Sequence, residues 1–409
     1  MKLLHTSDWH LGKRLENLSR LDEQKDVLNE ICAIAEAEQV DAVLISGDLF
    51  DTYNPPTEAV DLFYKTLKRL ACNGKRAVIA IAGNHDSPDR IDAPDPLARE
   101  CGIIFAGYPN VLITPFELES GLKVTHSEEG FAEITLPGCP DPLRLLLTPY
   151  ANEFRLKAYL GHQDSEEELR KLLNDHWTEL ADKYCNNEGV NVLISHLFIA
   201  RKGAALPEEP EDEKPILHVG GAQVIYSENI PQQMQYAAFG HLHRKQTIDT
   251  TPCPVIYSGS PISYSFAEAD QKKYVLVLDV QPGKMPVISH HELIKAKRLL
   301  RKRAKSISEA IEWLQEHREA LIELTMSTET YLTAEERKML NNAHNGIISI
   351  IPDVLRVDGD QANYRKTIDL TKGMDELFTD YFRYSKGQEP NAELMNLFKE
   401  ILAQDDEND

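Results

Sequence analysis

The chain has 409 residues, more than one hydrophobic core usually supports, so we expect two or three domains. Its formal net charge of −22 argues against a protein that holds nucleic acid through an overall basic surface. A nucleic-acid enzyme of this charge would need metal ions, a local basic patch or a basic partner. No apolar run approaches the roughly 18 residues of a membrane span, so we expect no membrane segment. The six cysteines are scattered without a CxxC pair, which is typical of reduced thiols. Together these features predict a cytoplasmic protein.

Strand-like and helical patterns alternate over the first hundred residues. Apolar runs within residues 2–8, 41–48 and 76–86 are typical of buried strands, and apolar residues recur at helical spacing over 27–34 and 60–70. Apolar runs separated by amphipathic helices predict βαβ units and a sheet covered on both faces. Right-handed crossovers bring the carboxyl ends of such strands to one edge, where ligands bind in open α/β sheets.

The alternation continues less regularly as far as residue 280. We expect a helix over residues 165–185 and strands over 190–196, 235–243 and 274–280. An acidic, proline-flanked segment over residues 206–215 interrupts this pattern and is typical of a solvated loop.

The pattern changes near residue 285, where we expect a small α/β domain to begin. A strand-like run over residues 285–294 precedes a basic stretch over 294–305, and helices are expected at about 307–323 and 333–343. The predicted parts of the chain are residues 1–284, 285–373 and 374–409.

Two short amphipathic helices are expected in the last of these parts. Their apolar stripes consist of Leu377, Phe378, Tyr381 and Phe382 and of Leu394, Leu397, Phe398 and Ile401. Such a stripe commonly packs on its own domain. The position of both stripes after a complete domain favours a surface for a partner protein instead.

Polar side chains with metal-binding atoms stand at the C-terminal ends of five predicted strands. They are Asp8, His10, Asp48, Asn84, His196, His241 and His243. Buried polar groups need partners, and we expect these groups to find them in one another. Seven oxygen and nitrogen donors exceed the four of a structural zinc site and suit two ions that share a ligand. Mixed imidazole and carboxylate ligation favours manganese, iron or zinc over magnesium or calcium.

The charge of such a cluster suits a phosphate substrate. Two divalent ions bring +4 and the two aspartates −2, which leaves about +2 because asparagine and histidine are neutral ligands. Two ions roughly 3.5–4 Å apart can clamp the attacking and leaving oxygens of an in-line displacement.

The motifs around these residues resemble those of the calcineurin-like metallophosphoesterases. The matching segments are DxH at Asp8, GDxxD at Gly47, GNHD at Gly83 and GHxH at Gly240. Within that family, "LHTSDWHLG", "GDLFDTYNPP" and "GHLHRKQ" are most similar to the SbcD nuclease subunits. The resemblance implies a two-sheet α/β sandwich flanked by helices, with a small α/β capping domain and C-terminal helices. It also implies a metal-dependent DNA nuclease of repair and recombination, a 3′-to-5′ double-strand exonuclease and single-strand endonuclease that opens hairpins and blocked ends.

The resemblance further implies two overlapping sets of metal ligands. They are Asp8, His10, Asp48 and His243 for one ion and Asp48, Asn84, His196 and His241 for the other. His85 is implied to face the substrate, where it stabilises the transition state or protonates the leaving oxygen. Asp51 is implied to orient His85, so that the two residues form a catalytic dyad. Archaeal and eukaryotic relatives tend to carry a histidine at the position of Asp51, which leaves open whether Asp51 also meets DNA.

The same resemblance implies the cofactors and partners. The expected ions are two divalent metals, with manganese the first choice. The C-terminal region binds the coiled-coil base of the SMC-like ATPase SbcC in that family, so we expect DNA and an SbcC-type ATPase as partners. We also expect a homodimer within a heterotetramer, associated with the nucleoid during repair.

Two other functions remain open from the sequence. One is a protein phosphatase or cyclic-nucleotide phosphodiesterase of the same superfamily. Protein phosphatases usually have the motifs GDxxDRG and GNHE, whereas in this chain Thr52 follows Asp51 and the GNHD motif ends in Asp86. A scaffold that has lost its metals is the other, although every ligand position is filled.

The basic residues near the predicted site have two interpretations. Lys13, Arg14, Arg20 and Arg90 follow the metal-site loops, and residues 294–305 form the one dense basic stretch. Each of these groups contacts DNA phosphates or is a solvated surface group.

Overall fold

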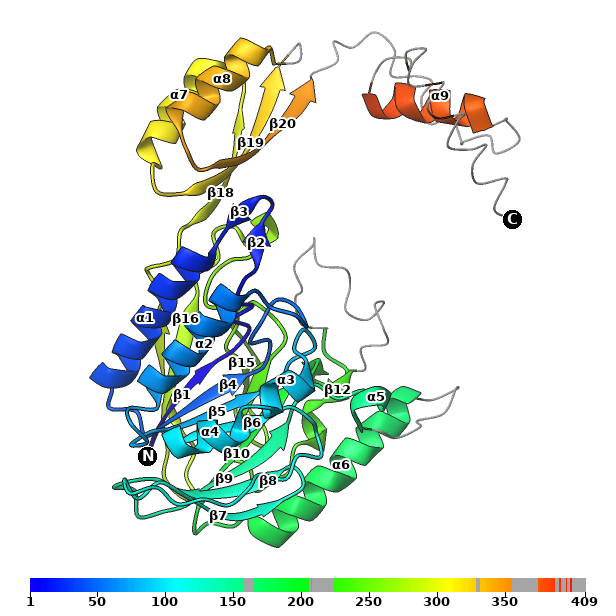
Figure 1. Cartoon of the computed structure of the whole chain (residues 1–409). Helices are drawn as coiled ribbons and strands as arrows, with labels where there is room; N and C mark the ends of the chain where they lie inside the picture. The colour runs from blue at the N-terminus through cyan, green and yellow to red at the C-terminus, as the bar shows by residue number, and fades with distance from the viewer. Residues whose placement is uncertain are drawn as a thin grey trace. The chain divides into compact units, whose positions relative to one another are not determined.

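The computed structural model describes residues 1–156, 165–205, 207, 224–328, 332–354, 374–386, 390, 395 and 398. Residues 1–353 form one compact unit, and residues 354–409 belong to a second. Figure 1 shows the sheets and helices of the first unit and helix α9 of the second. The finer division at residues 284/285 stays a prediction. The acidic segment 206–215 lies outside the described residues, apart from Pro207.

The first large sheet has six strands in the order β17-β16-β1-β4-β5-β6. Its strands span Lys2–Thr6 (β1), Ala42–Ser46 (β4), Ala77–Ile81 (β5), Ile103–Ala106 (β6), Tyr274–Asp279 (β16) and Val287–Glu292 (β17). Strands β1, β4, β5 and β6 run parallel, as the βαβ pattern predicted, whereas β16 pairs antiparallel with both of its neighbours, β1 and β17. Helices α1 (Leu21–Ala37) and α2 (Thr57–Leu70) cover one face of this sheet.

Both faces of the central strands are buried. Leu4 and Val43 pack with Phe63 of α2 beneath the helices, whereas Leu3 and Leu44 face the second large sheet. Successive side chains of a strand point to opposite faces, so burial on both sides requires apolar residues at every position. This requirement makes the strands recognisable in the sequence as continuous apolar runs.

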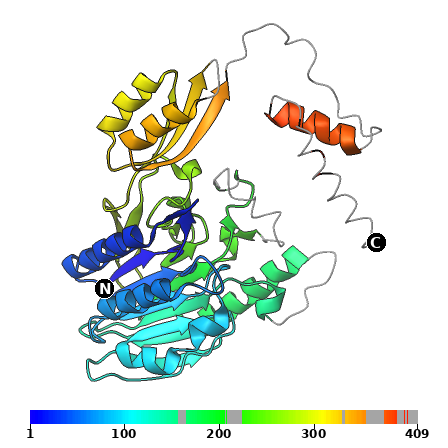
Figure 2. The same cartoon turned by 45° about the horizontal axis from the view of Figure 1, so that its top comes forward.

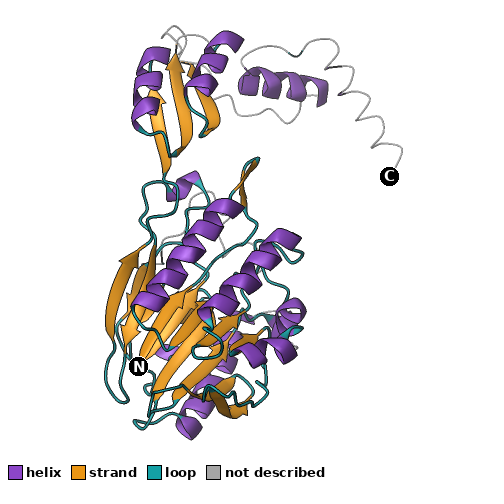
Figure 3. Cartoon of the chain, turned by 60° about the vertical axis from the view of Figure 1, so that its left-hand side comes forward, coloured by secondary structure: helices purple, strands orange, loops and turns teal. Residues whose placement is uncertain are grey.

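The second large sheet has seven strands in the order β14-β15-β13-β10-β9-β8-β7. Its strands span Lys123–Glu128 (β7), Phe131–Thr135 (β8), Leu143–Thr148 (β9), Val190–His196 (β10), Tyr236–Gly240 (β13), Gln246–Asp249 (β14) and Val255–Tyr257 (β15). Helix α6 (Ser165–Tyr184) covers its outer face through Trp177 and Leu180. Two sheets between two helical layers confirm the predicted sandwich, and Figure 3 shows its strands and helices by colour.

Shorter elements connect the layers. They are β2 (Arg14–Leu15), β3 (Leu18–Ser19), α3 (Pro88–Asp92), α4 (Asp95–Ala98), α5 (Glu153–Leu156), β11 (Ile199–Ala200) and β12 (Ile225–Tyr226). Hairpin partners β2 and β3 pair antiparallel, and β11 and β12 pair parallel.

A three-stranded sheet with two helices follows the sandwich (Figure 2). It consists of β18 (Leu299–Ala304), α7 (Ile307–Glu316), β19 (Leu321–Thr328), α8 (Ala334–Ala343) and β20 (Ile347–Val354). The predicted helix over 307–323 is therefore too long, because residues 321–328 form the central strand. The predicted strand over 285–294 also belongs elsewhere, since β17 extends the six-stranded sheet rather than this small one.

Much of the basic stretch 294–305 is paired with acidic groups. Arg301 Nε lies 2.8 Å from a carboxylate oxygen of Glu323, and Lys302 Nζ lies 2.9 Å from one of Glu309. Arg303 forms an ion pair with Asp353. These contacts favour a charge-balanced surface over a dedicated DNA contact at these three positions.

The second unit contains α9 (Met374–Lys386). Phe378 stacks on Phe398 with ring centroids 4.0 Å apart, so the two predicted stripes contact each other at this point. Leu394, Leu397 and Ile401 lie outside the described residues.

Two expectations from composition can be compared with the structure. Of the helices in the described ranges, none combines the length and apolar character needed to cross a membrane. All six cysteines lie in those ranges, and each carries a free thiol, as their spacing predicted.

Candidate metal centre

The predicted ligands gather where strands of both large sheets end. Asp8 and His10 follow β1, Asp48 follows β4 and Asn84 follows β5, whereas His196 ends β10 and the other two histidines follow β13. Parallel pairing within each sheet places these ends on the same edge. The structure thus brings together all seven predicted ligands.

The backbone at several ligands adopts a conformation that side chains rarely allow. Asp8, His10, Asp48 and His241 have positive φ angles of 53°, 40°, 48° and 111°. Each costs on the order of 1–3 kcal/mol and persists only where the surrounding structure enforces it. The sharp turns aim successive polar side chains of one loop into the same site.

Glycines of the motifs allow the loops to approach one another. A Cβ on Gly83 would lie 2.1 Å from Oδ1 of Asp48, and a Cβ on Gly240 would lie 1.9 Å from the carbonyl oxygen of Ser46. A side chain at Gly83 would displace the loop after β4, and one at Gly240 would push the second sheet away from the end of β4 in the first. The glycines of GNHD and GHxH are therefore needed for packing of the site.

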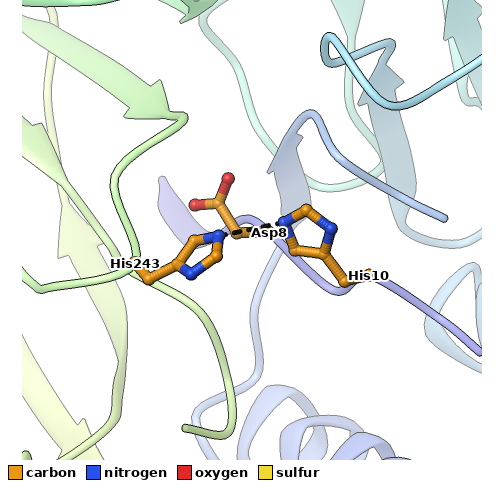
Figure 4. A group of neighbouring side chains, drawn as sticks. All are labelled: Asp8, His10 and His243. Atoms are coloured by element: carbon orange, nitrogen blue, oxygen red, sulfur yellow. Dashed lines mark hydrogen bonds between the residues drawn. The ribbon is translucent and has the colours of Figure 1, made fainter. Parts of the chain in front are cut away.

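One group of ligands consists of Asp8, His10 and His243, whose ligand atoms lie within 4.8 Å of one another (Figure 4). Nε2 of His10 lies 3.0 Å from Nε2 of His243. Burial holds the pKa of His10 well below its ordinary value, so that its ring is neutral. Two imidazole nitrogens turned toward each other in this way fit a shared cation.

A second group consists of Asp48, His196 and His241, again with ligand atoms within 4.8 Å of one another. Oδ1 of Asn84 lies 3.0 Å from Nε2 of His196 and 3.0 Å from Nδ1 of His241. The amide oxygen faces the same point as the two rings, as expected for a neutral metal ligand. Burial also lowers the pKa of His241, to about 3.

Asp48 belongs to the second group and also contacts a histidine of the first. Its Oδ2 is 3.3 Å from Nε2 of His10 and 3.3 Å from Nε2 of His196, one histidine from each group. Burial alone would raise the pKa of Asp48, but both histidines outweigh it and hold the pKa well below its usual range. An ionised carboxylate between two histidine-rich groups fits a ligand shared by two divalent ions.

Asp86 joins the two loops that carry Asp48 and Asn84. Its buried carboxylate accepts hydrogen bonds from the backbone N–H groups of Leu49, Phe50 and Gly83, at 3.0, 2.9 and 2.7 Å. Asp86 therefore supports both the metal site and the turn after β5.

Replacing Asp86 by alanine should destabilise the fold and weaken metal binding. Three buried N–H groups would lose their acceptor, at a cost of about 3–5 kcal/mol for a buried hydrogen-bonded charge. Urea unfolding and manganese content at limiting metal measure the two effects. The control is Asp89→Ala, which removes an exposed carboxylate that bonds the hydroxyl of Tyr108 and should cost less than about 1 kcal/mol. Equal stability of the two variants would contradict the assignment.

Arg155 supports the same loop and was not found from the sequence. Its buried guanidinium donates to the carbonyl oxygens of Gly83 at 2.7 Å and Asp86 at 2.8 Å. It also lies 3.2 Å from the hydroxyl of Tyr53. The short helix α5 therefore clamps the GNHD turn from outside the ligand set.

Glu268 and Lys273 form a second support that the sequence did not reveal. Oε1 of Glu268 lies 3.4 Å from Nδ1 of His243, and Lys273 donates to Glu268 and, at 3.0 Å, to the carbonyl oxygen of His243. Burial raises the pKa of Glu268, but Lys273 and His243 outweigh it and lower the pKa to about 2. A carboxylate on the far ring nitrogen orients a metal-binding histidine.

His85 contacts Asp51 in a different way from the expected dyad. Nδ1 of His85 lies 2.8 Å from the main-chain carbonyl oxygen of Asp51, and the backbone N–H of His85 donates to Oδ1 of Asp48 at 3.0 Å. The Asp51 carboxylate instead lies 3.3 Å from Nζ of Lys13 and 3.7 Å from Nδ1 of His10. The two residues are paired, but through the peptide carbonyl rather than the carboxylate.

The basic candidates near the site differ in their surroundings. Arg20 is buried and forms an ion pair with Glu23, so it is a structural residue and the phosphate-contact interpretation is wrong there. Arg90 donates to Oδ1 of Asn54 at 3.0 Å on the surface. Lys13 stays beside the metal centre through its contact with Asp51.

The chain is similar in sequence to one described family and to several known proteins. A sequence model of the family described as calcineurin-like phosphoesterase matches residues 1–245. The SbcD subunit of nuclease SbcCD from Bacillus subtilis (strain 168) is 36% identical over 421 residues, which cover 100% of each chain. Its counterpart from Escherichia coli (strain K12) is 28% identical over 295 residues, which cover 71% of this chain and 68% of that relative. A dimetal phosphatase structure from Danio rerio is 12% identical and covers 72% of this chain and 96% of its own, with a TM-score of 0.41.

Proposed function

Because the chain belongs to the calcineurin-like phosphoesterases, and within them to the SbcD nuclease subunits, we propose that it hydrolyses phosphodiester bonds of DNA as the nuclease partner of an SbcC-type ATPase. The observation that carries the proposal is that Asp48, a member of the group with His196 and His241, also lies 3.3 Å from His10 of the group with Asp8 and His243. The substrates we propose are duplex ends cut from 3′ to 5′, single strands, hairpins and blocked ends.

The catalytic roles we propose follow from the contacts of His85. Bound divalent ions would polarise the scissile phosphate and supply a nucleophile near neutral pH. Because the carbonyl oxygen of Asp51 can only accept, Nδ1 of His85 must carry a proton. Nε2 then holds the mobile proton, and His85 delivers it to the leaving oxygen.

Manganese is the ion we propose for both positions. The ligand set joins imidazole nitrogens with carboxylate and amide oxygens, a mixture that suits manganese better than magnesium or calcium. Titration of metal-free protein with manganese should reach two ions per chain.

One assay distinguishes this proposal from its rivals. Manganese-dependent release of nucleotides from labelled duplex ends supports the nuclease, whereas hydrolysis of a phosphoprotein without DNA cleavage would indicate a protein phosphatase. A metal-free scaffold would do neither. The complete ligand set, supported by Asp86, Arg155 and Glu268, argues against the scaffold.

The partner surface we propose is the C-terminal unit, acting within a heterotetramer that contains two copies of this chain and forms at the nucleoid during repair. Tyr381 on α9 is 65% exposed, whereas Phe378 is stacked on Phe398. An exposed aromatic side chain on an amphipathic helix suits an apolar groove of a partner.

Removing residues 374–409 should abolish binding to the ATPase and leave manganese-dependent cleavage of single strands intact. The metal ligands all precede residue 244, and residues 1–353 form their own compact unit. Pull-down of the ATPase and a single-strand cleavage assay measure the two outcomes. The milder variant Tyr381→Glu should weaken binding without removing the helix. Unchanged pull-down by the shortened chain would refute the proposed surface.

A further inference from the structure

A polar pocket of about 330 Å³ lies next to loops that carry metal ligands. Its cationic lining residues are Arg201, Arg244 and Lys245, and its other lining side chains are uncharged. The described residues thus surround this cavity with positive charge in a chain whose net charge is −22. A pocket of this kind suits an anion.

Both walls of the pocket continue directly from metal ligands. Arg201 stands five residues after His196, and Arg244 is the residue after His243. Five residues span at most about 17 Å, which limits the distance from the pocket to the metal centre. The turn after His243 is tightly packed, because a Cβ on Gly259 would lie 2.7 Å from the carbonyl oxygen of His243.

Lys245 contacts a neutral acceptor, whereas the charge of Arg201 is partly offset by one long ion pair. Lys245 Nζ lies 2.9 Å from Nδ1 of His290, which is a neutral acceptor when it takes that bond. Arg201 forms an ion pair with Asp249 in which Nε lies 3.9 Å from Oδ2, too long for a hydrogen bond, so the guanidinium can still donate to a phosphate. That carboxylate already accepts from the Ser227 hydroxyl at 2.7 Å and the Thr250 N–H at 2.7 Å.

We propose that this phosphate pocket, formed by Arg201, Arg244 and Lys245, binds a backbone phosphate of the DNA strand whose scissile phosphate lies at the metal centre. The inference rests on the proposed nuclease function. Guanidinium groups bind phosphate through paired hydrogen bonds, and they do so without reading the base. Phosphates follow one another every 3.4 Å along a duplex strand, so the bound phosphate lies within about five nucleotides of the cut.

A scan with neutral phosphates tests the pocket. Each single-stranded oligonucleotide carries one methylphosphonate, which removes one charge, at a position one to six nucleotides from the cut. The unaltered protein should show about a tenfold loss of kcat/KM at one position, the value of one charge-assisted hydrogen bond. Arg201→Gln should cleave the fully charged strand about tenfold more slowly. A methylphosphonate at the sensitive position should cause no further loss in this variant, because the mutation and the methylphosphonate remove the same contact.

Salt dependence gives an independent readout. The slope of log affinity against log salt concentration should fall by about 0.7 in Arg201→Gln, the value for one phosphate contact on a single strand. The control is Lys65→Gln, which removes an equal charge from an exposed pair with Asp61 on α2 and should keep both the slope and the methylphosphonate profile.

A small substrate separates failure of the pocket from failure of the proposed function. Bis(4-nitrophenyl) phosphate carries a single phosphate and cannot reach from the ions to the pocket. The ratio of the cleavage rate on DNA to the rate on this diester therefore corrects for any effect of the substitution on the metal centre. Failure of the unaltered protein to cleave either substrate would overturn the nuclease proposal. Cleavage of both substrates with an unchanged methylphosphonate profile in Arg201→Gln would overturn the phosphate pocket alone.

Discussion

Replacing Asp48 by alanine should abolish phosphodiester cleavage and remove more metal than loss of any other single ligand. Its carboxylate oxygen lies 3.3 Å from one histidine of each ligand group, so it is placed to serve both ions. By contrast, Asp8 and Asn84 each belong to one ligand group. Without Asp48, both ions would lose a ligand and one of the two carboxylate charges that offset their mutual repulsion. Metal analysis per chain and nuclease assays in manganese measure the effect.

The matched control is His241→Ala, which belongs to one ligand group alone. This variant should lose one ion and keep the other, whereas Asp48→Ala should retain less than one ion per chain at the same free manganese. Circular dichroism of both variants checks that the sandwich is folded. Two ions per chain in Asp48→Ala would sink the bridging assignment.

The ligands could be predicted from the sequence because each stands where a buried strand ends. The apolar run over residues 77–81 leads directly to Asn84, and the run over 190–196 ends in His196 itself. Nothing in the packing of a strand calls for an amide or an imidazole at that place. Parallel strands align such ends on one edge, so local pattern and fold class together locate the site.

The supporting residues could not be predicted in the same way. Arg155 acts on Gly83, which is 72 residues away in the chain, and no motif surrounds it. Glu268 and Lys273 contact His243 from the segment that connects β15 of the second sheet to β16 of the first. Their roles come from tertiary contacts, for which hydrophobic periodicity carries no signal.

The errors in the fold have similar causes. Residues 321–328 form a strand that lies against α7, so its apolar side chains extended the helical pattern past Glu316. The sequence does not predict that β17 belongs to the sandwich. Most of its positions are exposed and most of its residues are polar, so it lacks the apolar run of a buried strand. The strands between residues 103 and 148 were not predicted, and two of them, β7 and β8, include partly exposed positions. Burial on one face only weakens the apolar signal of a strand.

Asn84 and His85 are neighbours in the GNHD turn but have different surroundings. Oδ1 of Asn84 lies 3.0 Å from ring nitrogens of both His196 and His241, inside a ligand group. His85 is half-buried, and its Nδ1 is taken by the carbonyl oxygen of Asp51. Loss of a metal ligand and loss of a proton donor can therefore be separated by substitutions at adjacent positions.

Replacing His85 by alanine should leave both ions bound and slow cleavage by something like the 10²- to 10⁴-fold typical of a positioned general acid. Asn84→Ala is the matched comparison: it should weaken metal occupancy, and excess manganese should partly restore its activity. Excess manganese should not restore His85→Ala. A substrate with a 4-nitrophenolate leaving group needs little protonation, so His85→Ala should lose far less activity on that substrate than on DNA.

The role of Asp51 follows from the same contact and completes this test. Because the peptide carbonyl rather than the carboxylate holds the ring of His85, Asp51→Asn should keep the ring in place and slow cleavage only mildly. Asp51→Asn should instead remove the ion pair with Lys13, whose ammonium group lies 3.3 Å from the Asp51 carboxylate. A loss in Asp51→Asn as large as in His85→Ala would restore the carboxylate dyad. Loss of a metal ion from His85→Ala, or recovery of its turnover with excess manganese, would instead make His85 a ligand and rule out the proton-donor role.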